Sequence, residues 1–258
     1  MTVIEAGIER QQREQDRLVT GANRGLGFAT ARLLGQHGVT VIIGARDFAA
    51  GERAAAELRC QQIDAEAVTL DVTDVVSVQA AAKHIAARHG RLDILVNNAG
   101  ILPEATDGGG DDPIDLGTFR KTFETNVLGT VAVTEQFLSL LREAEAGRIV
   151  NVSSTMGSLA DQLNTASPYY GVVVPAYQGS KAALNALTIA LAKSLHDTPI
   201  KVNSVCPGWL QTDLGGAENR AAAPTTAADG ARIVVEMALV GHDGPTGQFV
   251  DHSGVVAW

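Results

Sequence analysis

The amino-acid sequence predicts an α/β fold built on a single doubly wound parallel sheet of about seven strands, with helices on both faces. From Leu18 onward, short runs rich in β-branched residues alternate with longer alanine-rich segments. Such alternation is typical of parallel strands joined by right-handed helical crossovers. The run 41–43 is apolar at every position, as expected for a strand buried on both faces. Together these observations indicate a Rossmann-type architecture.

The expected elements alternate along the whole chain. The strands are expected at residues 18–20, 39–44, 67–70, 92–96, 148–152, 201–205 and 248–250. The helices are expected at residues 26–36, 50–59, 75–88, 116–141, 176–195 and 227–239. Neither a repeat nor a linker divides this pattern, so residues 17–258 are expected to form one domain. Residues 1–16 are expected to form a polar, disordered extension.

Composition limits the classes of function. The formal net charge is −9, whereas binding to nucleic acid or to an anionic membrane requires a basic face. The sequence has neither an apolar run long enough to span a membrane nor a secretory signal in residues 1–17. Neither the two cysteines nor the six histidines have metal-ligand spacing. We therefore expect a cytoplasmic protein that binds no nucleic acid, membrane or metal.

A glycine turn follows the first expected strand. Gly21, Gly25 and Gly27 lie in the segment 20–27, TGANRGLG, directly before a helical pattern. Glycines at such a junction let the backbone approach a pyrophosphate, and the helix N-terminus offers N–H groups and partial positive charge. The spacing differs from the common G-x-G-x-x-G fingerprint, so a tight turn without a ligand is the alternative explanation.

The end of the second expected strand bears on the cofactor. NAD enzymes usually place an acidic residue there, which accepts hydrogen bonds from the ribose 2′-hydroxyl. Here Ala45 occupies that place and Arg46 follows. The guanidinium groups of Arg46 and Arg24 would bind the 2′-phosphate of NADP(H). Two alternatives stay open: the arginines are solvated surface charges, or Asp47 accepts the ribose hydroxyl.

Tyr177 and Lys181 open an expected helix and are four residues apart. This spacing places both side chains on one helix face. A nearby ammonium favours the phenolate and lowers the pKa of the tyrosine toward working pH, as a general acid–base catalyst requires. A Y-x-x-x-K string is common by chance, but this one follows the expected strand 148–152 and the serines Ser153 and Ser154.

Several motifs in one order carry a family resemblance. They are TGANRGLG at 20–27, DV at 71–72, NNAG at 97–100, NV at 126–127, VSS at 152–154, YxxxK at 177–181 and PG at 207–208. With this set, the chain resembles the short-chain dehydrogenase/reductase (SDR) family from residue 18 to its end. The TGANRG turn and the closing Trp258 resemble the carbonyl-reductase-like branch.

The resemblance implies a role for each matching residue. Tyr177 would give a proton to a substrate carbonyl oxygen while the nicotinamide gives a hydride, and Lys181 would bind the nicotinamide ribose. The implied catalytic residues are Asn126, Ser154, Tyr177 and Lys181. The implied cofactor-binding residues are Gly21, Asn23, Arg24, Gly25, Leu26, Gly27, Arg46, Asp71, Val72, Asn98, Ala99, Gly100, Tyr177, Lys181, Pro207, Gly208 and Thr212.

Structural roles are the alternatives for three of these residues. Asn98 would tie central strands together, Asn126 would bend a helix, and Asp71 would cap one. Of the two serines, Ser154 aligns with the catalytic serine of the family, and Ser153 is expected to face inward.

Two segments and one strand depart from the family pattern. Residues 102–115 are acidic and glycine-rich and predict a mobile loop, and residues 159–175 lengthen the stretch between Ser154 and Tyr177. Monomeric carbonyl reductases carry a longer insertion at the second position, so both a monomer and a homo-oligomer stay open. Its aromatic and valine side chains would either cover an apolar substrate or pack on the protein's own surface. Polar residues before Leu18 predict a shortened first strand.

The resemblance implies NADPH-dependent reduction of a ketone or aldehyde to an alcohol. Leu102, Leu159, Trp209 and Leu210 suggest an apolar pocket, and therefore a bulky, apolar or quinone-like carbonyl compound. One alternative is NADP-dependent oxidation of a secondary alcohol, because the same site runs both ways. Another is a non-catalytic NADP(H)-sensing protein, although such proteins commonly lose the tyrosine or the lysine.

Overall fold

The computed structural model describes residues 16–107 and 114–258. Residues 1–15 of the expected extension and residues 108–113 of the expected loop lie outside the described residues.

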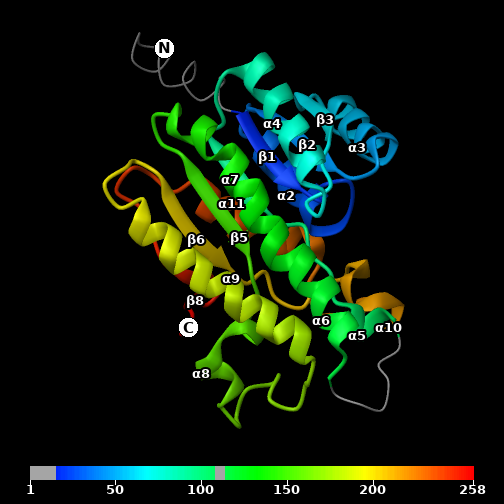
Figure 1. Cartoon of the computed structure of the whole chain (residues 1–258). Helices are drawn as coiled ribbons and strands as arrows, with labels where there is room; N and C mark the ends of the chain where they lie inside the picture. The colour runs from blue at the N-terminus through cyan, green and yellow to red at the C-terminus, as the bar shows by residue number, and fades with distance from the viewer. Residues whose placement is uncertain (1–15, 108–113) are drawn as a thin grey trace.

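One sheet organises the described part of the chain (Figure 1). Its strand order is β3-β2-β1-β4-β5-β6-β7-β8, and every neighbouring pair is parallel except β7 with β8. The strands are β1 (Asp16–Thr20), β2 (Thr40–Ala45), β3 (Ala65–Thr69), β4 (Ile94–Asn97), β5 (Arg148–Val152), β6 (Lys201–Val205), β7 (Phe249–Asp251) and β8 (Gly254–Val255). The predicted fold class is confirmed; β8 was not predicted, because two residues are too few for a periodic signal.

Helices follow the strands as expected. The longer ones are α2 (Gly25–Gly35), α3 (Phe48–Cys60), α4 (Val75–His89), α6 (Leu116–Phe123), α7 (Gly129–Arg142), α9 (Pro175–Ser194) and α11 (Ala227–Ala238). The shorter ones are α5 (Pro103–Thr106), α8 (Leu159–Gln162) and α10 (Gly216–Ala222), with 3₁₀ turns η2 (Thr155–Gly157) and η3 (Asp213–Gly215). The single helix expected at 116–141 is interrupted by a π-helix, η1 (Glu124–Leu128).

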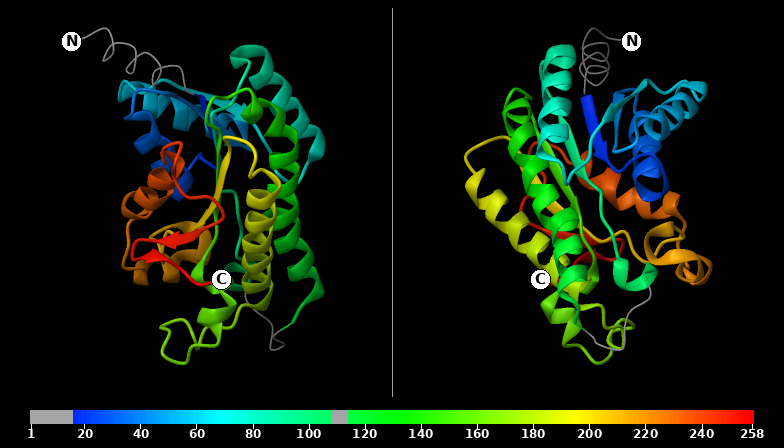
Figure 2. Two further views of the ribbon diagram at one scale, coloured as in Figure 1. Left: turned by 90° about the vertical axis from the view of Figure 1, so that its left-hand side faces the viewer. Right: turned by 45° about the vertical axis from the view of Figure 1, so that its right-hand side comes forward.

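Two helical layers cover the two faces of the sheet (Figure 2). On one face α2, α3 and α11 pack against alternate strand residues such as Val41 and Ile43. On the other face α4, α7 and α9 pack against the residues between them, such as Ile42. Because successive strand residues point to opposite faces, one apolar run supplies both cores.

The first strand corrects an expectation. Asp16 and Arg17 belong to β1 and pair with Thr40 and Val41 of β2, so the predicted shortening of this strand is wrong. Both residues are buried, and each makes a hydrogen bond to a distant segment. The backbone N–H of Asp16 donates to Asp93 (2.9 Å), and the guanidinium of Arg17 donates to the carbonyl oxygen of Leu34 (3.2 Å).

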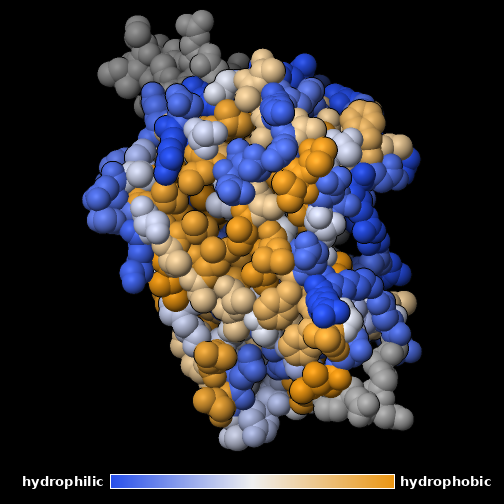
Figure 3. Space-filling model, viewed as in Figure 1, coloured by the Kyte–Doolittle hydropathy of each residue, from blue (hydrophilic) through white to orange (hydrophobic). Residues whose placement is uncertain are grey.

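Apolar side chains gather on one face of the molecular surface (Figure 3). They lie over the middle of the view, where α7 and α9 cross the sheet in Figure 1. Leu128 and Val131 are exposed at the start of this helix pair. Apolar groups exposed together can contact another protein, so both a monomer and a homo-oligomer are compatible with the fold. In the described ranges, no helix combines the length and hydrophobicity needed to cross a membrane.

Candidate active site

The predicted site residues gather at the carboxyl edge of the sheet. The glycine turn follows β1, the NNAG motif ends β4, the two serines follow β5, and Pro207 follows β6. This edge lies at the lower end of Figure 1, next to α5, α8 and α10. In open α/β sheets, ligands bind beyond the carboxyl ends of the strands.

The glycine turn is shaped by close backbone contacts. Gly21 and Gly25 have positive φ values of 63° and 57°. A Cβ atom on Gly27 would come within 2.5 Å of both the Asn98 side chain and the carbonyl oxygen of Gly21. Any side chain at this position would therefore push the turn away from β4 and change its shape.

The helix that follows the turn begins without a side-chain cap. Its N-cap residue is Arg24, whose side chain makes no capping hydrogen bond, whereas the side chains of Asp47, Asp74 and Asp115 cap α3, α4 and α6. The first N–H groups of α2 thus point from a glycine-rich turn toward the carboxyl edge. This arrangement fits the pyrophosphate of a dinucleotide.

Asn98 fastens the glycine turn to β4. Its side-chain N–H donates to the carbonyl oxygen of Thr20 (2.8 Å), and the Thr20 hydroxyl accepts the backbone N–H groups of Asn98 (3.0 Å) and Ala99 (2.9 Å). Asn98 therefore ties the ends of the central strands β1 and β4 together, which was the structural alternative for this residue. The same bonds hold Ala99 and Gly100 beside the turn.

The two predicted phosphate-binding arginines differ in their surroundings. Arg46 is exposed just after β2, while Arg24 forms an ion pair with Asp213 at 3.1 Å. Asp213 also binds Arg220 at 2.8 Å, which connects the glycine turn to the segment of η3 and α10. The Oδ1 atom of Asp47 accepts N–H groups of the first turn of α3, so this carboxylate serves as a helix cap.

Asp71 and Val72 stand where β3 ends. The Asp71 carboxylate accepts the N–H (3.0 Å) and hydroxyl (2.8 Å) of Thr73, and it is Asp74 that caps α4. The alternative that Asp71 caps a helix is therefore wrong. Val72 packs against Gly129, where a Cβ atom would approach it within 2.8 Å.

Tyr177, Ser154 and Lys181 meet beside the end of β5. The Ser154 side chain lies near enough to the Tyr177 hydroxyl to lower its pKa. The ammonium of Lys181 donates to the carbonyl oxygen of Val152 (2.7 Å) and lies 5.5 Å from the centre of the Tyr177 ring. Ser153 faces inward, as expected, and its hydroxyl donates to the carbonyl oxygen of Lys181 at 3.5 Å.

Burial controls the acidity of this pair. It raises the pKa of Tyr177 above its ordinary value, with a further contribution from Cys206, while the hydrogen bond with Ser154 lowers it. Burial also lowers the pKa of Lys181 to about 8. The direction for Tyr177 is opposite to the one expected from the spacing, because burial of the hydroxyl makes the largest contribution to its pKa.

Asn126 lies in the π-helix and is almost fully buried. Its amide accepts the N–H of Ile101 (2.9 Å) and donates to the carbonyl oxygen of Ile101 (3.0 Å) and to the Ser180 hydroxyl (3.0 Å). A Cβ atom on Gly100 would lie 3.4 Å from its Oδ1 atom. The irregular helix and the position beside the NNAG motif thus occur together, as is frequent where a π-helix serves a functional site.

The segment after β6 closes the site toward the glycine turn. Gly208 has a positive φ of 89°, and the Thr212 side chain would lie 3.5 Å from a Cβ atom on Gly25. Leu210 packs against Gly230 of α11, so it serves the core more than the expected pocket. Trp209 and Leu159 are exposed.

The insertion at 159–175 is anchored to the C-terminus. The N–H of Ala160 donates to the carbonyl oxygen of Trp258 (3.1 Å), and the Trp258 ring stacks on Phe249. Tyr169 is partly buried, and its pKa is raised by burial and by the nearby Cys206. Tyr170 and residues 172–173 are exposed, whereas Tyr169 and Val174 are partly buried, so both explanations of this segment stay open.

Sequence reasoning missed polar contacts between distant segments. A buried chain of hydrogen bonds links Asn97 to Asn151, Asn151 to Thr188, and Thr188 to Ser204, across three strands and α9. The NNAG motif pointed to Asn97, but nothing local marked its partners. Glu104 and Asp213 were also missed.

Among the residues that the structure describes, no group of three His, Cys, Asp or Glu side chains is arranged to hold a metal.

The fold and the Ser–Tyr–Lys arrangement are those of an oxidoreductase. The chain belongs to the short-chain dehydrogenase family, whose family model matches residues 17–223.

Known relatives cover nearly the whole chain. Carbonyl reductase [NADPH] 1 from Sus scrofa is 33% identical and covers 93% of this chain and 93% of its own length. A structure of NADPH-bound carbonyl reductase from chicken fatty liver superposes with a TM-score of 0.81, at 27% identity, covering 96% of this chain and 100% of that chain. A structure of actinorhodin polyketide ketoreductase with NADPH gives 0.79, at 30% identity, covering 94% and 97%.

Proposed function

We propose that this protein reduces a ketone or aldehyde to an alcohol with NADPH. The observation that carries the proposal is the buried Tyr177 side chain, with Ser154 near enough to its hydroxyl to lower its pKa and Lys181 one helical turn away, bonded to the end of β5. Relatives named as NADPH carbonyl reductase and ketoreductase support the same chemistry.

The residues of the chain supply binding and proton transfer. A bound nicotinamide would supply the hydride to the carbonyl carbon. Ser154 donates a hydrogen bond to the carbonyl oxygen and fixes its position. Tyr177 transfers its hydroxyl proton to that oxygen, which yields the alcohol and leaves a phenolate. Lys181 stabilises this phenolate, and a proton from solvent restores Tyr177.

The residues present fit NADP(H). The uncapped start of α2 and the shape of the glycine turn suit the pyrophosphate. Ala45 is apolar where an NAD enzyme has an acid, and Asp47 is used as a helix cap. Exposed Arg46, with Arg24 once it exchanges Asp213 for phosphate, would hold the 2′-phosphate.

The substrate is proposed to be bulky and at least partly apolar. Exposed Tyr170 and the valines at 172–173 lie on the insertion that ends at the catalytic helix α9, and Trp209 follows β6 at the same edge. These side chains would cover one face of a cyclic ketone, a quinone or a polyketide-like ketone.

The direct test is NADPH oxidation by the purified chain against a panel of aldehydes, cyclic ketones, quinones and polyketide-like ketones. We expect turnover of at least one bulky compound, and a loss in kcat of about 10³-fold in Tyr177→Phe with NADPH affinity unchanged. Glu57→Gln, on the exposed side of α3, is the control, because Glu57 has no role in the proposed site.

Each other result has a definite meaning. Near-wild-type kcat in Tyr177→Phe would refute the assigned acid. Turnover confined to secondary alcohols with NADP⁺ would favour oxidation, and NADPH binding without turnover in either direction would favour a sensor. Turnover of only small polar carbonyls would contradict the apolar pocket.

The cofactor preference is tested by combining Arg46→Asp with Arg24→Ala. Loss of two charge-assisted contacts should lower kcat/KM for NADPH about 100-fold and change that for NADH by less than about threefold. Asp213→Asn is the control, because it breaks the ion pair with Arg24 but keeps both arginines. Equal losses for both cofactors would sink the assignment to NADP(H).

A further inference from the structure

The catalytic helix α9 begins without a capping side chain of its own. Its N-cap residue is Val174, and its first helical residue is Pro175, which has no N–H group. The N–H of Val174 donates to the Gln178 side chain at 3.2 Å. The next two N–H groups, of Ala176 and Tyr177, need acceptors from elsewhere, because a helix leaves its first N–H groups unsatisfied.

One carboxylate from a distant segment accepts both groups. Glu104 of α5 accepts the N–H of Ala176 through Oε1 (2.7 Å) and the N–H of Tyr177 through Oε2 (3.1 Å). A carboxylate at this end of a helix also interacts favourably with the helix dipole. The backbone of the proposed acid is therefore held by a residue more than seventy positions earlier in the chain.

These contacts are part of a closed ring of hydrogen bonds. Ser180 donates to the carbonyl oxygen of Tyr177 (2.8 Å) and accepts from Asn126 (3.0 Å), and Asn126 holds both backbone groups of Ile101. Glu104, three residues after Ile101, accepts the N–H of Tyr177 and so closes the ring. The segment after the NNAG motif is thus bonded at both ends to the elements that carry the catalytic groups.

The two members of the Tyr–Lys pair are held independently. The ammonium of Lys181 is fixed on β5 through the carbonyl oxygen of Val152, while the first turn of α9 is fixed through Glu104. A displacement of that turn would move the Tyr177 hydroxyl relative to both Lys181 and Ser154. Displacements of about 1 Å at a reacting group cost about 100-fold in rate.

The same short helix touches the segment that closes the site. A Cβ atom on Gly216 would lie 3.4 Å from the carbonyl oxygen of Ala105, so α5 packs between α9 and the start of α10. Asp213 ties that segment to Arg24 of the glycine turn. Glu104 therefore stands at the junction of the catalytic helix and the segment that follows Thr212.

We propose that Glu104 is a positioning residue, which caps α9 from α5 and thereby sets the place of the Tyr177 hydroxyl against Ser154 and Lys181. It touches neither substrate nor cofactor in this role. The effect on turnover rests on the proposed reductase function, whereas the effect on Tyr177 itself does not.

The test uses the full chain with Glu104→Gln, which keeps the size of the side chain but replaces one acceptor by a donor. We expect kcat to fall about 10- to 100-fold, with the NADPH dissociation constant within about twofold of wild type. Glu104→Asp should restore part of kcat, and Glu57→Gln on the exposed side of α3 is the matched control.

A second readout does not need a substrate. The chain contains three tyrosines, so labelling the ring carbon that bears the hydroxyl gives three NMR signals, assigned with Tyr177→Phe and Tyr170→Phe. Glu104→Gln should shift or broaden the signal of Tyr177 and leave that of Tyr170 in place. If no carbonyl is reduced by wild type, the reductase function fails while this readout still decides the role of Glu104.

Two results would overturn the proposal. One is an unchanged Tyr177 signal in Glu104→Gln, whatever happens to kcat. The other is an equal change of all three tyrosine signals together with weaker NADPH binding, which would assign Glu104 to general stability instead.

Discussion

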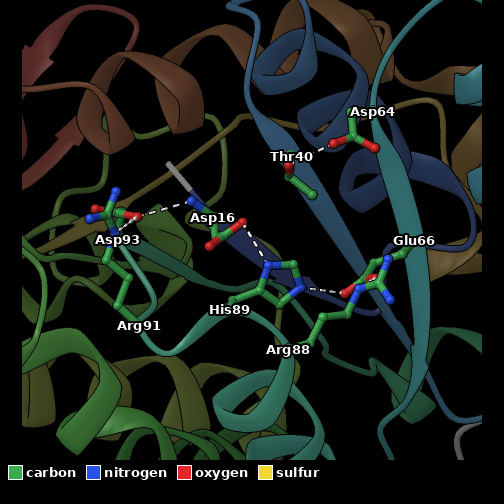
Figure 4. Close-up of polar contacts among 8 residues, drawn as sticks. All are labelled: Asp16, Thr40, Asp64, Glu66, Arg88, His89, Arg91 and Asp93. Carbon is green, nitrogen blue, oxygen red and sulfur yellow. Dashed lines mark hydrogen bonds and ion pairs between the residues drawn. The ribbon is translucent and has the colours of Figure 1, made fainter. Parts of the chain in front are cut away.

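At the amino edge of the sheet, buried charged groups share ion pairs or several hydrogen bonds, whereas at the carboxyl edge the buried ammonium of Lys181 makes a single hydrogen bond among the described residues, to a backbone carbonyl. His89 lies between Asp16 (3.0 Å) and Glu66 (2.7 Å), and Asp93 accepts the side chain of Arg91 at 3.3 Å (Figure 4). Lys181 donates to Val152 and is as deeply buried as the groups at the opposite edge.

The difference separates two uses of buried charge. At the amino edge, ion pairs and hydrogen bonds offset part of the desolvation cost beside a cavity of about 310 Å³, although burial still raises the pKa of Asp16 to about 6 and lowers that of Arg17 to about 10. At the carboxyl edge burial likewise lowers the pKa of Lys181 to about 8, and the contacts of this ammonium in the described part of the chain include no carboxylate that would offset the cost. Ionisable groups that have strongly shifted pKa values and few charged partners are typical of functional sites. Such sites often lower the stability of the fold while they support activity.

The largest expected effect comes from removing the incompletely paired charge. Lys181→Met should lower kcat about 10³-fold, while the free energy of unfolding stays level or rises by about 1 kcal/mol, because a buried charge is replaced by an apolar group. Steady-state kinetics and urea unfolding measure the two quantities. Lys83→Met on the exposed side of α4 is the control. A large loss of stability in Lys181→Met would show that this lysine belongs with the amino-edge groups.

Removing a buried charge that has several hydrogen-bond partners should lower stability and leave turnover nearly unchanged. Arg148 begins β5 and donates to the carbonyl oxygens of Val240 (2.8 Å), Gly147 (2.8 Å) and Pro199 (3.3 Å). Arg148→Met leaves these carbonyls without their donor and should lower the free energy of unfolding by about 3 kcal/mol. The kcat of the folded fraction should stay within about twofold of wild type. A selective loss of kcat would contradict the separation of the two edges.

Local patterns were sufficient for the fold but not for these contacts. The alternation of apolar runs and helical segments predicted seven of the strands, and motif spacing placed Tyr177, Lys181 and Ser154 at one edge. Polar residues before Leu18 predicted a short strand, because sequence does not show that Asp93 and Leu34 lie ready to satisfy them.

The same limit applies within the site. Glu104 lies in an acidic, glycine-rich segment that predicts a loop, and its partners on α9 are distant in sequence. Arg24 looked available for a phosphate, but its ion pair with Asp213 depends on how the segment after β6 folds back. Spacing predicts which residues share an edge, whereas long-range partners depend on packing.

The smallest expected effect tests how complete the pairing at the amino edge is. Burial is the main cause that raises the pKa of Asp16 from 3.8 to about 6; Asp93 and Glu66 add to it, while His89 and Arg91 oppose it. A carboxyl whose pKa is higher in the folded state stabilises the protein below its unfolded pKa, and this contribution disappears as the pH rises through the folded value. Wild type should therefore lose stability relative to Asp16→Asn between about pH 4 and pH 6.

Asp16→Asn isolates this contribution, because its side-chain oxygen can still accept from His89. Allowing for partial solvent exposure, the difference in unfolding free energy between variant and wild type should change by about 2 kcal/mol over that window. Urea unfolding at a series of pH values measures it, and kcat at neutral pH should be unchanged. A difference that is constant with pH would mean that the ion pairs offset the burial of Asp16 completely. The desolvation cost of a buried charge would then be left uncompensated at Lys181, on the carboxyl edge of the sheet, and not at Asp16.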